Sequence, residues 1–103
     1  MIIERTNTVD EGNLKSVARV LESFAARNQL TPREREMAGL LLVYGYSNKE
    51  LAEHCDISVK TVKNHLDNMM RKLEIHSTRK LYSLLLQSFY EEEEAVLLSI
   101  KER

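Results

Sequence analysis

The sequence predicts an all-α protein: four core helices, an extra N-terminal amphipathic helix and a C-terminal helical extension. Apolar residues recur every three or four positions along most of the chain, which is the period of an amphipathic helix. Only three glycines and one proline interrupt these segments, and no stretch shows the sustained alternation that a half-buried strand requires. The 103 residues suffice for one compact domain with a modest core.

Composition narrows the class of protein. Hydrophobic residues make up 43% of the chain and charged residues 30%, which is typical of a globular protein and excludes wholesale disorder. The sequence has no run of about 18 apolar residues, so no membrane span is predicted, and the polar N-terminus is unlike a secretory signal. The single cysteine, Cys55, cannot form an internal disulfide and suits a small buried position. We therefore expect a cytoplasmic protein without membrane contact.

The first 28 residues predict an arm and one helix. Residues 1–12 are polar, lack periodicity and are interpreted as a flexible arm. Asn13 is a candidate N-cap for a helix that runs to about Arg27, within residues 13–28. The apolar side chains of this helix share one face: Leu14, Val17, Ala18, Leu21, Phe24 and Ala25.

The next helix has a strong start signal. Thr31 is its N-cap candidate, Pro32 takes the first helical position, and Glu34 can accept bonds from free backbone amides. Gly45 is expected to end the helix in a left-handed conformation that costs glycine little. The inner face is then made by Met37, Leu40, Leu41 and Tyr44.

A short helix, a tight turn and a longer helix follow. Ser47 and Glu50 have the spacing of a capping box at the start of a helix over Asn48–His54. Residues 55–58 predict the turn, and Ser58 caps a helix over about residues 58–74. This order of elements is the pattern of a DNA-binding helix-turn-helix.

The longer helix has two unlike faces. One is an apolar stripe made by Val62, Leu66, Met69 and Leu73. The opposite face is polar and carries Lys60, Asn64, Asp67, Asn68 and Arg71, with Lys63 on its flank. Such a helix can pack on a small core and offer hydrogen-bond donors to a polyanion.

Charge is unevenly spread along the chain. The net charge is −1, but residues 58–80 hold six basic and two acidic residues, a local charge of +4. Residues 91–103 hold five Glu, one Lys and one Arg, a local charge of −3. Screening limits the reach of a charge to roughly 8 Å at physiological salt, so the local sign decides docking on phosphates.

The C-terminal part predicts one more helix and an extension. Ser77 caps a helix from Thr78 to about Tyr90, with Leu81, Leu84 and Leu85 on its apolar face. The run Glu91–Glu94 is either a solvated helical face or a boundary. The apolar segment that follows, residues 95–100, needs a place to be buried. We expect a domain over residues 30–90 and an acidic and apolar extension over residues 91–103.

Residues 30–86 resemble the DNA-binding domain of LuxR/FixJ/GerE-type bacterial regulators. The resemblance rests on Leu30–Glu36, Ser47–Ala52, Ile57-Ser58, Thr61–Leu66 and Lys72-Leu73, which occur in order at the expected spacing. It implies a four-helix domain whose third helix enters the major groove of double-stranded DNA. It also implies a homodimer on paired half-sites, commonly formed through the fourth helix.

The resemblance places several residues at the DNA. Lys63 and Asn64 occupy groove-facing positions, and the usual pairings are Lys with guanine and Asn with adenine. Asp67 departs from the family pattern; it repels phosphate but could accept from a cytosine amino group. Phosphate contacts are expected from Lys49, Lys60, Thr61, Arg71 and Lys72, with Asn68 on the same face. Ser47 and Ser58 begin helices whose free amides suit an anion.

The chain has more apolar helix faces than a four-helix core needs, which favours dimerisation. The candidate contact residues are Leu81, Leu84 and Leu85 on the fourth helix of the domain and Leu14, Val17 and Leu21 on the N-terminal helix. Either helix, or both, could form the contact.

No cofactor, metal or catalytic site is predicted. The histidines His54, His65 and His76 are eleven residues apart, so no two share a helix face at metal-ligand spacing. The acidic pairs Glu34/Glu36 and Glu91–Glu94 are expected on exposed faces, with no nucleophile or phosphate loop nearby. We therefore expect a regulator and not an enzyme.

Two other functions remain open. A sigma-factor region-four domain shares the helix-turn-helix pattern and would act with RNA polymerase, although the His65-Leu66 and Lys72-Leu73 blocks favour the LuxR type. An interaction adaptor could keep the fold, contact another regulator and not bind DNA; the low net charge, Asp67 and the acidic tail motivate this. The N-terminal segment does not match a receiver or sensing domain. Either a small stand-alone regulator or a piece of a longer chain is possible, and Met1 slightly favours the first.

Overall fold

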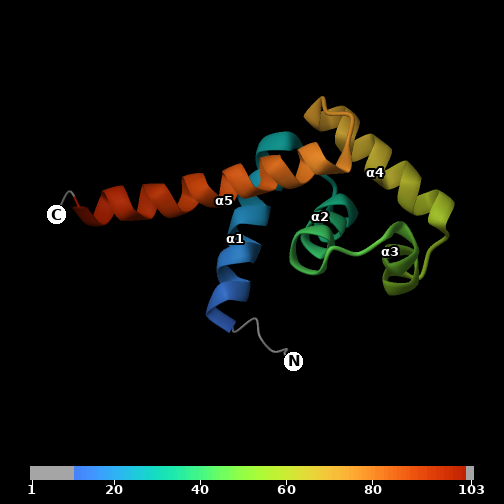
Figure 1. The fold of residues 1–103 in the computed structure, drawn as a ribbon, viewed down its shortest axis with the longest axis horizontal. Helices are drawn as coiled ribbons and strands as arrows, with labels where there is room; N and C mark the ends of the chain where they lie inside the picture. The colour runs from blue at the N-terminus through green and yellow to red at the C-terminus, as the bar shows by residue number, and fades with distance from the viewer. Residues whose placement is uncertain (1–10, 102–103) are drawn as a thin grey trace.

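The computed structural model describes residues 11–101, which form five α-helices and no strand in that range. They are α1 (Glu11–Asn28), α2 (Pro32–Tyr44), α3 (Asn48–Cys55), α4 (Val59–Leu73) and α5 (Thr78–Lys101). The all-α prediction is confirmed. Figure 1 shows α3 and α4 at one end of the molecule and the C-terminal part of α5 at the other.

The start of α1 differs from our prediction. The helix begins at Glu11, so Asn13 lies in its first turn and does not cap it. Helix ends are the least determined feature of a periodic pattern, because fraying and capping compete within a residue or two. Most of the expected arm, residues 1–10, lies outside the described residues.

The predicted caps are present at the next four helices, including Ser77 before α5, which accepts from the N–H of Lys80 at 3.1 Å. Thr31 accepts from the backbone N–H of Glu34 at 3.1 Å, and the Glu34 carboxylate accepts from the N–H of Thr31 at 2.9 Å. Ser47 and Glu50 exchange the same two bonds at the start of α3. Ser58 accepts from the N–H of Thr61 at the start of α4, at 3.0 Å. These bonds satisfy amides that have no partner within the helix.

Left-handed residues end α2, α3 and α4. Gly45, with a φ of 64°, terminates α2 as expected, and Asp56, with a φ of 57°, closes α3 before the turn. The amide of Asp56 donates to the carbonyl groups of Ala52 and Glu53. Ile57 then donates its N–H to the Ala52 carbonyl at 3.0 Å. This tight connection sets the angle between α3 and α4.

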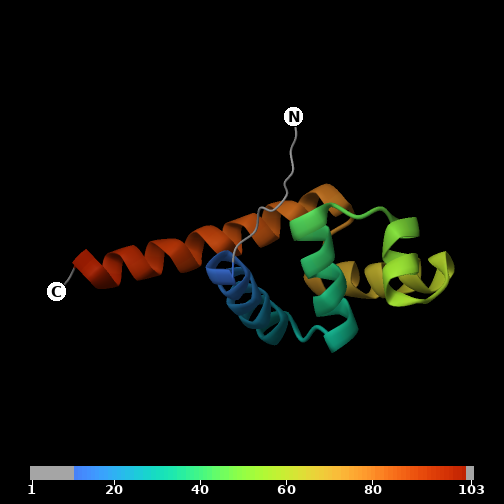
Figure 2. The ribbon, with the colours of Figure 1, turned by 90° about the horizontal axis from the view of Figure 1, so that it is seen from below.

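The core draws on all five helices. Its buried members include Leu21 and Phe24 from α1, Met37 and Leu41 from α2, Leu51 from α3, Val62 and Met69 from α4, and Leu81 and Leu85 from α5. Cys55 is buried, as predicted. The helix α1 packs on α2 and α5, while α3 packs mainly on α4, so the helix-turn-helix projects from one side of the bundle (Figure 2).

The last helix is longer than predicted. We expected an end near Tyr90, but α5 continues through the acidic run to Lys101. The run is thus a solvated helical face and not a boundary. Glutamate favours helix, and no glycine or proline occurs after Gly45 to break it. The apolar segment that we expected to be buried remains exposed where it is described, because Leu98 and Ile100 are exposed.

Candidate nucleic-acid interface

The helix α4 separates its two faces as the sequence predicts. Val62 and Met69 are fully buried and Leu66 is 6% exposed, so the apolar stripe seals the core. Leu73, the last residue of the stripe, is half-buried. Anchoring on this side fixes which residues point outward.

The outward face of α4 carries the residues that we expected at DNA. Six of them are exposed: Lys60, Lys63, Asn64, Asp67, Asn68 and Arg71. Arg71 donates to the side-chain oxygen of Asn68 at 2.9 Å, which orients both groups along one ridge. Lys63 and Asn64 are both exposed in the described part of the chain, so this face is accessible without rearrangement.

Two helix starts flank this face. Ser47 and Lys49 are exposed at the start of α3, and Ser58 is exposed at the start of α4. Thr61 is half-buried, and its hydroxyl lies 2.9 Å from the Ser58 hydroxyl. The positive end of each helix dipole therefore lies at the surface with hydroxyl groups beside it, an arrangement that favours phosphate.

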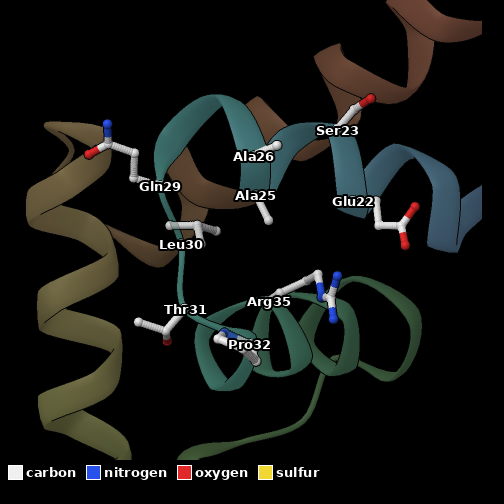
Figure 3. Close-up of a pocket in the computed structure, with 9 residues that line it drawn as sticks. All are labelled: Glu22, Ser23, Ala25, Ala26, Gln29, Leu30, Thr31, Pro32 and Arg35. Carbon is white, nitrogen blue, oxygen red and sulfur yellow. The ribbon is translucent and has the colours of Figure 1, made fainter.

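Lys72 differs from the other predicted phosphate contacts. Its ammonium donates to the Glu34 carboxylate at 2.8 Å and to the Gln29 carbonyl at 3.1 Å. Lys72 thereby joins the end of α4 to the start of α2 and to the connection after α1. Figure 3 shows Gln29 at that connection, beside α4. The structure thus gives this lysine partners within its own chain.

Glu34 is buried, contrary to our expectation of an exposed carboxylate, and only 3% of its surface is accessible. Burial by itself raises the pKa of Glu34, but bonds from Lys72 and Thr31 outweigh it and hold the pKa below its usual value. The carboxylate therefore stays charged at neutral pH. Sequence reasoning found its capping role but not its burial, because Lys72 is 38 residues away.

A group of aromatic side chains lies next to the start of α3. The rings of Tyr44 and Tyr46 stack with their centroids 5.3 Å apart, and Tyr46 is tilted against His54 at 5.9 Å. We expected Tyr44 on the inner face of α2, but it is 60% exposed. Gly45 ends the helix beside it, so Tyr44 turns toward Tyr46 and away from the core.

The candidate dimer residues fall into three groups. Leu21, Leu81 and Leu85 are buried within the chain's own core. Val17 and Leu84 are half-buried and packed against the edge of that core. The side chain of Leu14 lies outside the described part of the chain. Of the described candidates, Val17 and Leu84 therefore keep the most surface for a second copy.

Figure 3 shows a groove between α1 and the start of α2. It encloses about 580 Å³ and includes Ala25, Ala26 and Arg35 among its lining residues. It contains none of the predicted DNA-binding residues. Within residues 11–101, no three His, Cys, Asp or Glu side chains gather as metal ligands would. Nor does any described helix combine the length and hydrophobicity needed to cross a bilayer.

Comparison with known proteins now identifies the domain. Residues 28–85 match the family model described as "Bacterial regulatory proteins, luxR family". The response regulatory protein YgeK of Escherichia coli strain K12, described as uncharacterized, is 38% identical over 69 residues, which are 67% of this chain and 46% of that protein. No solved structure matches the chain.

Two further relatives are also response regulators by name. The tetrathionate response regulatory protein TtrR of Salmonella typhimurium strain LT2 is 39% identical over 79 residues, 77% of this chain and 36% of that protein. The response regulator VraR of Staphylococcus aureus strain Mu3 is 50% identical over 46 residues, 45% of this chain and 22% of that protein. The chain spans less than half the length of each of these relatives. Because the family match covers more than half of the chain and includes the whole helix-turn-helix, this chain belongs to the luxR family of bacterial regulatory proteins, which are DNA-binding transcription regulators and not enzymes.

Proposed function

We propose that this chain binds double-stranded DNA at specific sequences and inserts α4 into the major groove. The observation that carries the proposal is the separation of faces on α4. Its apolar stripe is buried against the core, while its lysines and asparagines are exposed. The major groove of B-DNA admits one α-helix, and its base edges present a distinct pattern for each base pair.

The exposed residues fall into two groups, those that contact bases and those that contact phosphates. Lys63 and Asn64 are both exposed on α4, where Lys can donate to guanine and Asn can pair with adenine. Lys49, Lys60, Thr61 and Arg71 are better suited to phosphates, together with the free amides after Ser47 and Ser58. Phosphate contacts supply affinity and base contacts supply sequence preference.

Asp67 shapes this preference. It is exposed on the same face, so its carboxylate repels nearby phosphates and lowers the affinity for DNA in general. In the groove it can accept from the amino group of cytosine. Asp67 thus lowers the affinity for random DNA and raises the affinity for a site with a cytosine at the matching position. Both effects raise the ratio of specific to non-specific binding.

We also propose that two copies act together on paired half-sites in the bacterial cytoplasm. Dimeric helix-turn-helix proteins place their recognition helices about one DNA turn apart, so that each copy makes the same set of contacts at its own half-site. Leu84, half-buried on the first part of α5, is the candidate on this helix that keeps accessible surface. The names of two relatives, both response regulatory proteins, support a regulator that acts in response to a signal.

The deciding experiment selects DNA fragments from a random pool with the full chain. The recovered site is then titrated by fluorescence anisotropy at two salt concentrations, beside a scrambled site of equal length. We expect one enriched motif, tight binding to it and a steeper salt dependence than a neutral protein would show. A chain that binds no DNA at low salt, and instead forms a stable complex with another regulator, would be an adaptor.

A further inference from the structure

The helix α5 carries two apolar faces. One packs into the core through Leu81 and Leu85, which are at most 1% exposed. The other carries Leu86, Tyr90 and Ile100, which are 55%, 76% and 61% exposed. Large side chains exposed along one helix are costly, and Leu86 and Tyr90 also line one surface groove, which favours an interaction site.

The spacing of this second face is that of a helix-packing seam. Leu86, Tyr90, Glu93 and Ile100 follow one another by four, three and seven residues. At 100° per residue, such positions stay within roughly 40° of one line along the helix. Leu86, Phe89, Tyr90, Glu93 and Glu94 also line a shallow groove of about 660 Å³. The surface therefore has the shape that a second helix requires.

Its place in the fold keeps the surface open. Both views show the second half of α5 extending beyond α1, away from α3 and α4 (Figures 1 and 2). The face that we propose for DNA lies at the opposite end of the molecule. A partner on α5 and a duplex on α4 can therefore be bound at the same time.

Charge decides which partner fits. Glu93 and Glu94 lie at the groove, within the run Glu91–Glu94. Among the described residues, Arg19 is the one cation within ion-pair distance of this run, with its Nε 3.9 Å from the Glu92 carboxylate. Three of the four carboxylates thus have no such ion-pair partner within the described part of the chain. A partner with Lys or Arg beside an apolar stripe would complement them.

The same charge disfavours a second copy of this chain as the occupant. The exposed stripe extends from Leu86 to Ile100, so its middle lies at Glu93. A parallel pair in register brings Glu93 next to Glu93 of the partner. An antiparallel pair centred on the stripe brings the two acidic runs together as well. Like charges directly opposite each other destabilise a helix pair, and Arg19, the described cation within ion-pair distance of the run, already lies next to Glu92 of its own chain.

We propose that the exposed face of distal α5 binds a basic amphipathic helix of another protein. We call this surface the distal face; it consists of Leu86, Phe89, Tyr90, Glu93, Glu94 and Ile100. The matching helix has apolar residues at heptad spacing and Lys or Arg beside them. The stripe covers fifteen residues, or about 21 Å at 1.5 Å per residue, so a partner helix of about four turns covers it. The proposal does not depend on DNA binding.

The test uses a synthetic helical peptide of sixteen residues with Leu at the two seam positions of each heptad and Lys beside them. A matched peptide has Glu in place of Lys. Each is titrated into the ¹⁵N-labelled full chain, and amide shifts and affinity are recorded. We expect shifts confined to α5 after Tyr82, and at least tenfold tighter binding of the basic peptide.

Three variants complete the experiment, each checked for helical content by circular dichroism. Glu93→Lys with Glu94→Lys should reverse the preference and favour the acidic peptide. Leu86→Ser with Tyr90→Ser should weaken the basic peptide at least tenfold. The control Tyr44→Ser removes another exposed aromatic, 60% accessible on α2, and should change neither affinity.

Two results would overturn the proposal. One is equal affinity for the two peptides in the unmodified chain, since charge would then not select the partner. The other is a dimer at micromolar concentration, found by light scattering, that becomes monomeric with Leu86→Ser and Tyr90→Ser. A second copy would then cover the face in spite of its carboxylates.

Discussion

At the residue scale, the two lysines that matter most have opposite surroundings. Lys63 is exposed on α4 without a described partner in the chain, whereas Lys72 is held between Glu34 and Gln29. Sequence reasoning grouped both as DNA contacts because both lie on the same helix with the same side-chain chemistry. Only the folded chain distinguishes them, since the partners of Lys72 come from 38 and 43 residues away.

Replacing Lys63 by Ala should weaken binding to the selected site and relax the preference at one base pair. The expected loss is about 1–3 kcal/mol, the usual contribution of one side chain that reads a base edge. Titration against sites changed at single base pairs measures it. Lys15→Ala removes an exposed lysine from α1 and serves as the control. An unchanged affinity for Lys63→Ala would show that the groove assignment is wrong.

Replacing Lys72 by Met should leave the salt dependence of DNA binding nearly unchanged. Each phosphate contact contributes about 0.9 to the slope of log affinity against log salt, so Lys60→Met should lower that slope by about this amount. Lys72→Met should instead lower the free energy of unfolding by about 1–3 kcal/mol, because Glu34 loses a bonded partner in a buried place. A slope that falls equally in both variants would make Lys72 a phosphate contact after all.

At the element scale, local signals and long-range packing determined different things. The caps at Thr31, Ser47 and Ser58 were predictable, because each bond joins residues three apart in the sequence. The length of α5 was not predicted, because a run of four glutamates fits an exposed helical face as well as a polar boundary. The bonds from Lys72 to Glu34 and to the Gln29 carbonyl link α4 to α2 and to the connection after α1. They form only when these helices pack together, so their contribution to stability is a property of the packed helices.

The stability that the Glu34–Lys72 ion pair contributes should depend on pH in the acid range. The pKa of Glu34 is lower in the folded chain than its ordinary value of 4.5, so the unfolded chain binds more protons between the two values. The stabilisation is therefore complete above about pH 4.5 and is lost as pH falls through the folded pKa. Chemical denaturation at several pH values should show this loss, and Glu34→Gln should remove that part of the pH dependence. If the pH dependence of the free energy of unfolding were the same in Glu34→Gln, the Glu34–Lys72 ion pair would not be its source.

Reversing the charge of Asp67 tests the electrostatics of α4. Asp67→Lys should strengthen binding to random DNA and steepen its salt dependence, because a repulsive charge becomes an attractive one on the face that meets phosphates. Gel-shift titrations at two salt concentrations measure both changes. Glu22→Lys makes the same change in net charge on an exposed position of α1 and is the matched control. An equal effect of both variants would mean that total charge, and not this face, governs binding.

At the scale of the whole molecule, α1 and α5 determine what the domain can contact. The helix α1 packs on α2 and α5, so three of the leucines that we expected at a dimer contact lie inside the core. The apolar surface that remains includes Val17 and Leu84, at the edge of the core, and the distal face at the far end of α5. The sequence showed an excess of apolar helix faces but could not assign them, because assignment needs the crossing of α1 and α5.

If two copies bind DNA through Leu84, a polar residue there should uncouple them. Leu84→Ser should leave binding to a single half-site nearly unchanged but remove the cooperative gain on paired half-sites. Analytical ultracentrifugation and titration of both DNAs measure this. Leu86→Ser, two residues along the same helix but on its distal face, should retain the cooperativity. Loss of cooperativity in both variants would show that the dimer contact extends onto the distal face.

The sequence by itself determined the helical class, four of the N-terminal caps and the two-faced recognition helix. Each of these depends on residues within about one or two helical turns of one another, and their spacing is written directly in the chain. Tertiary structure alone decided that Glu34 is buried against Lys72, that α5 extends past the body, and that most of the expected dimer leucines are internal. Those outcomes depend on which surfaces meet across dozens of residues, and that competition for burial is settled only when all five helices pack together.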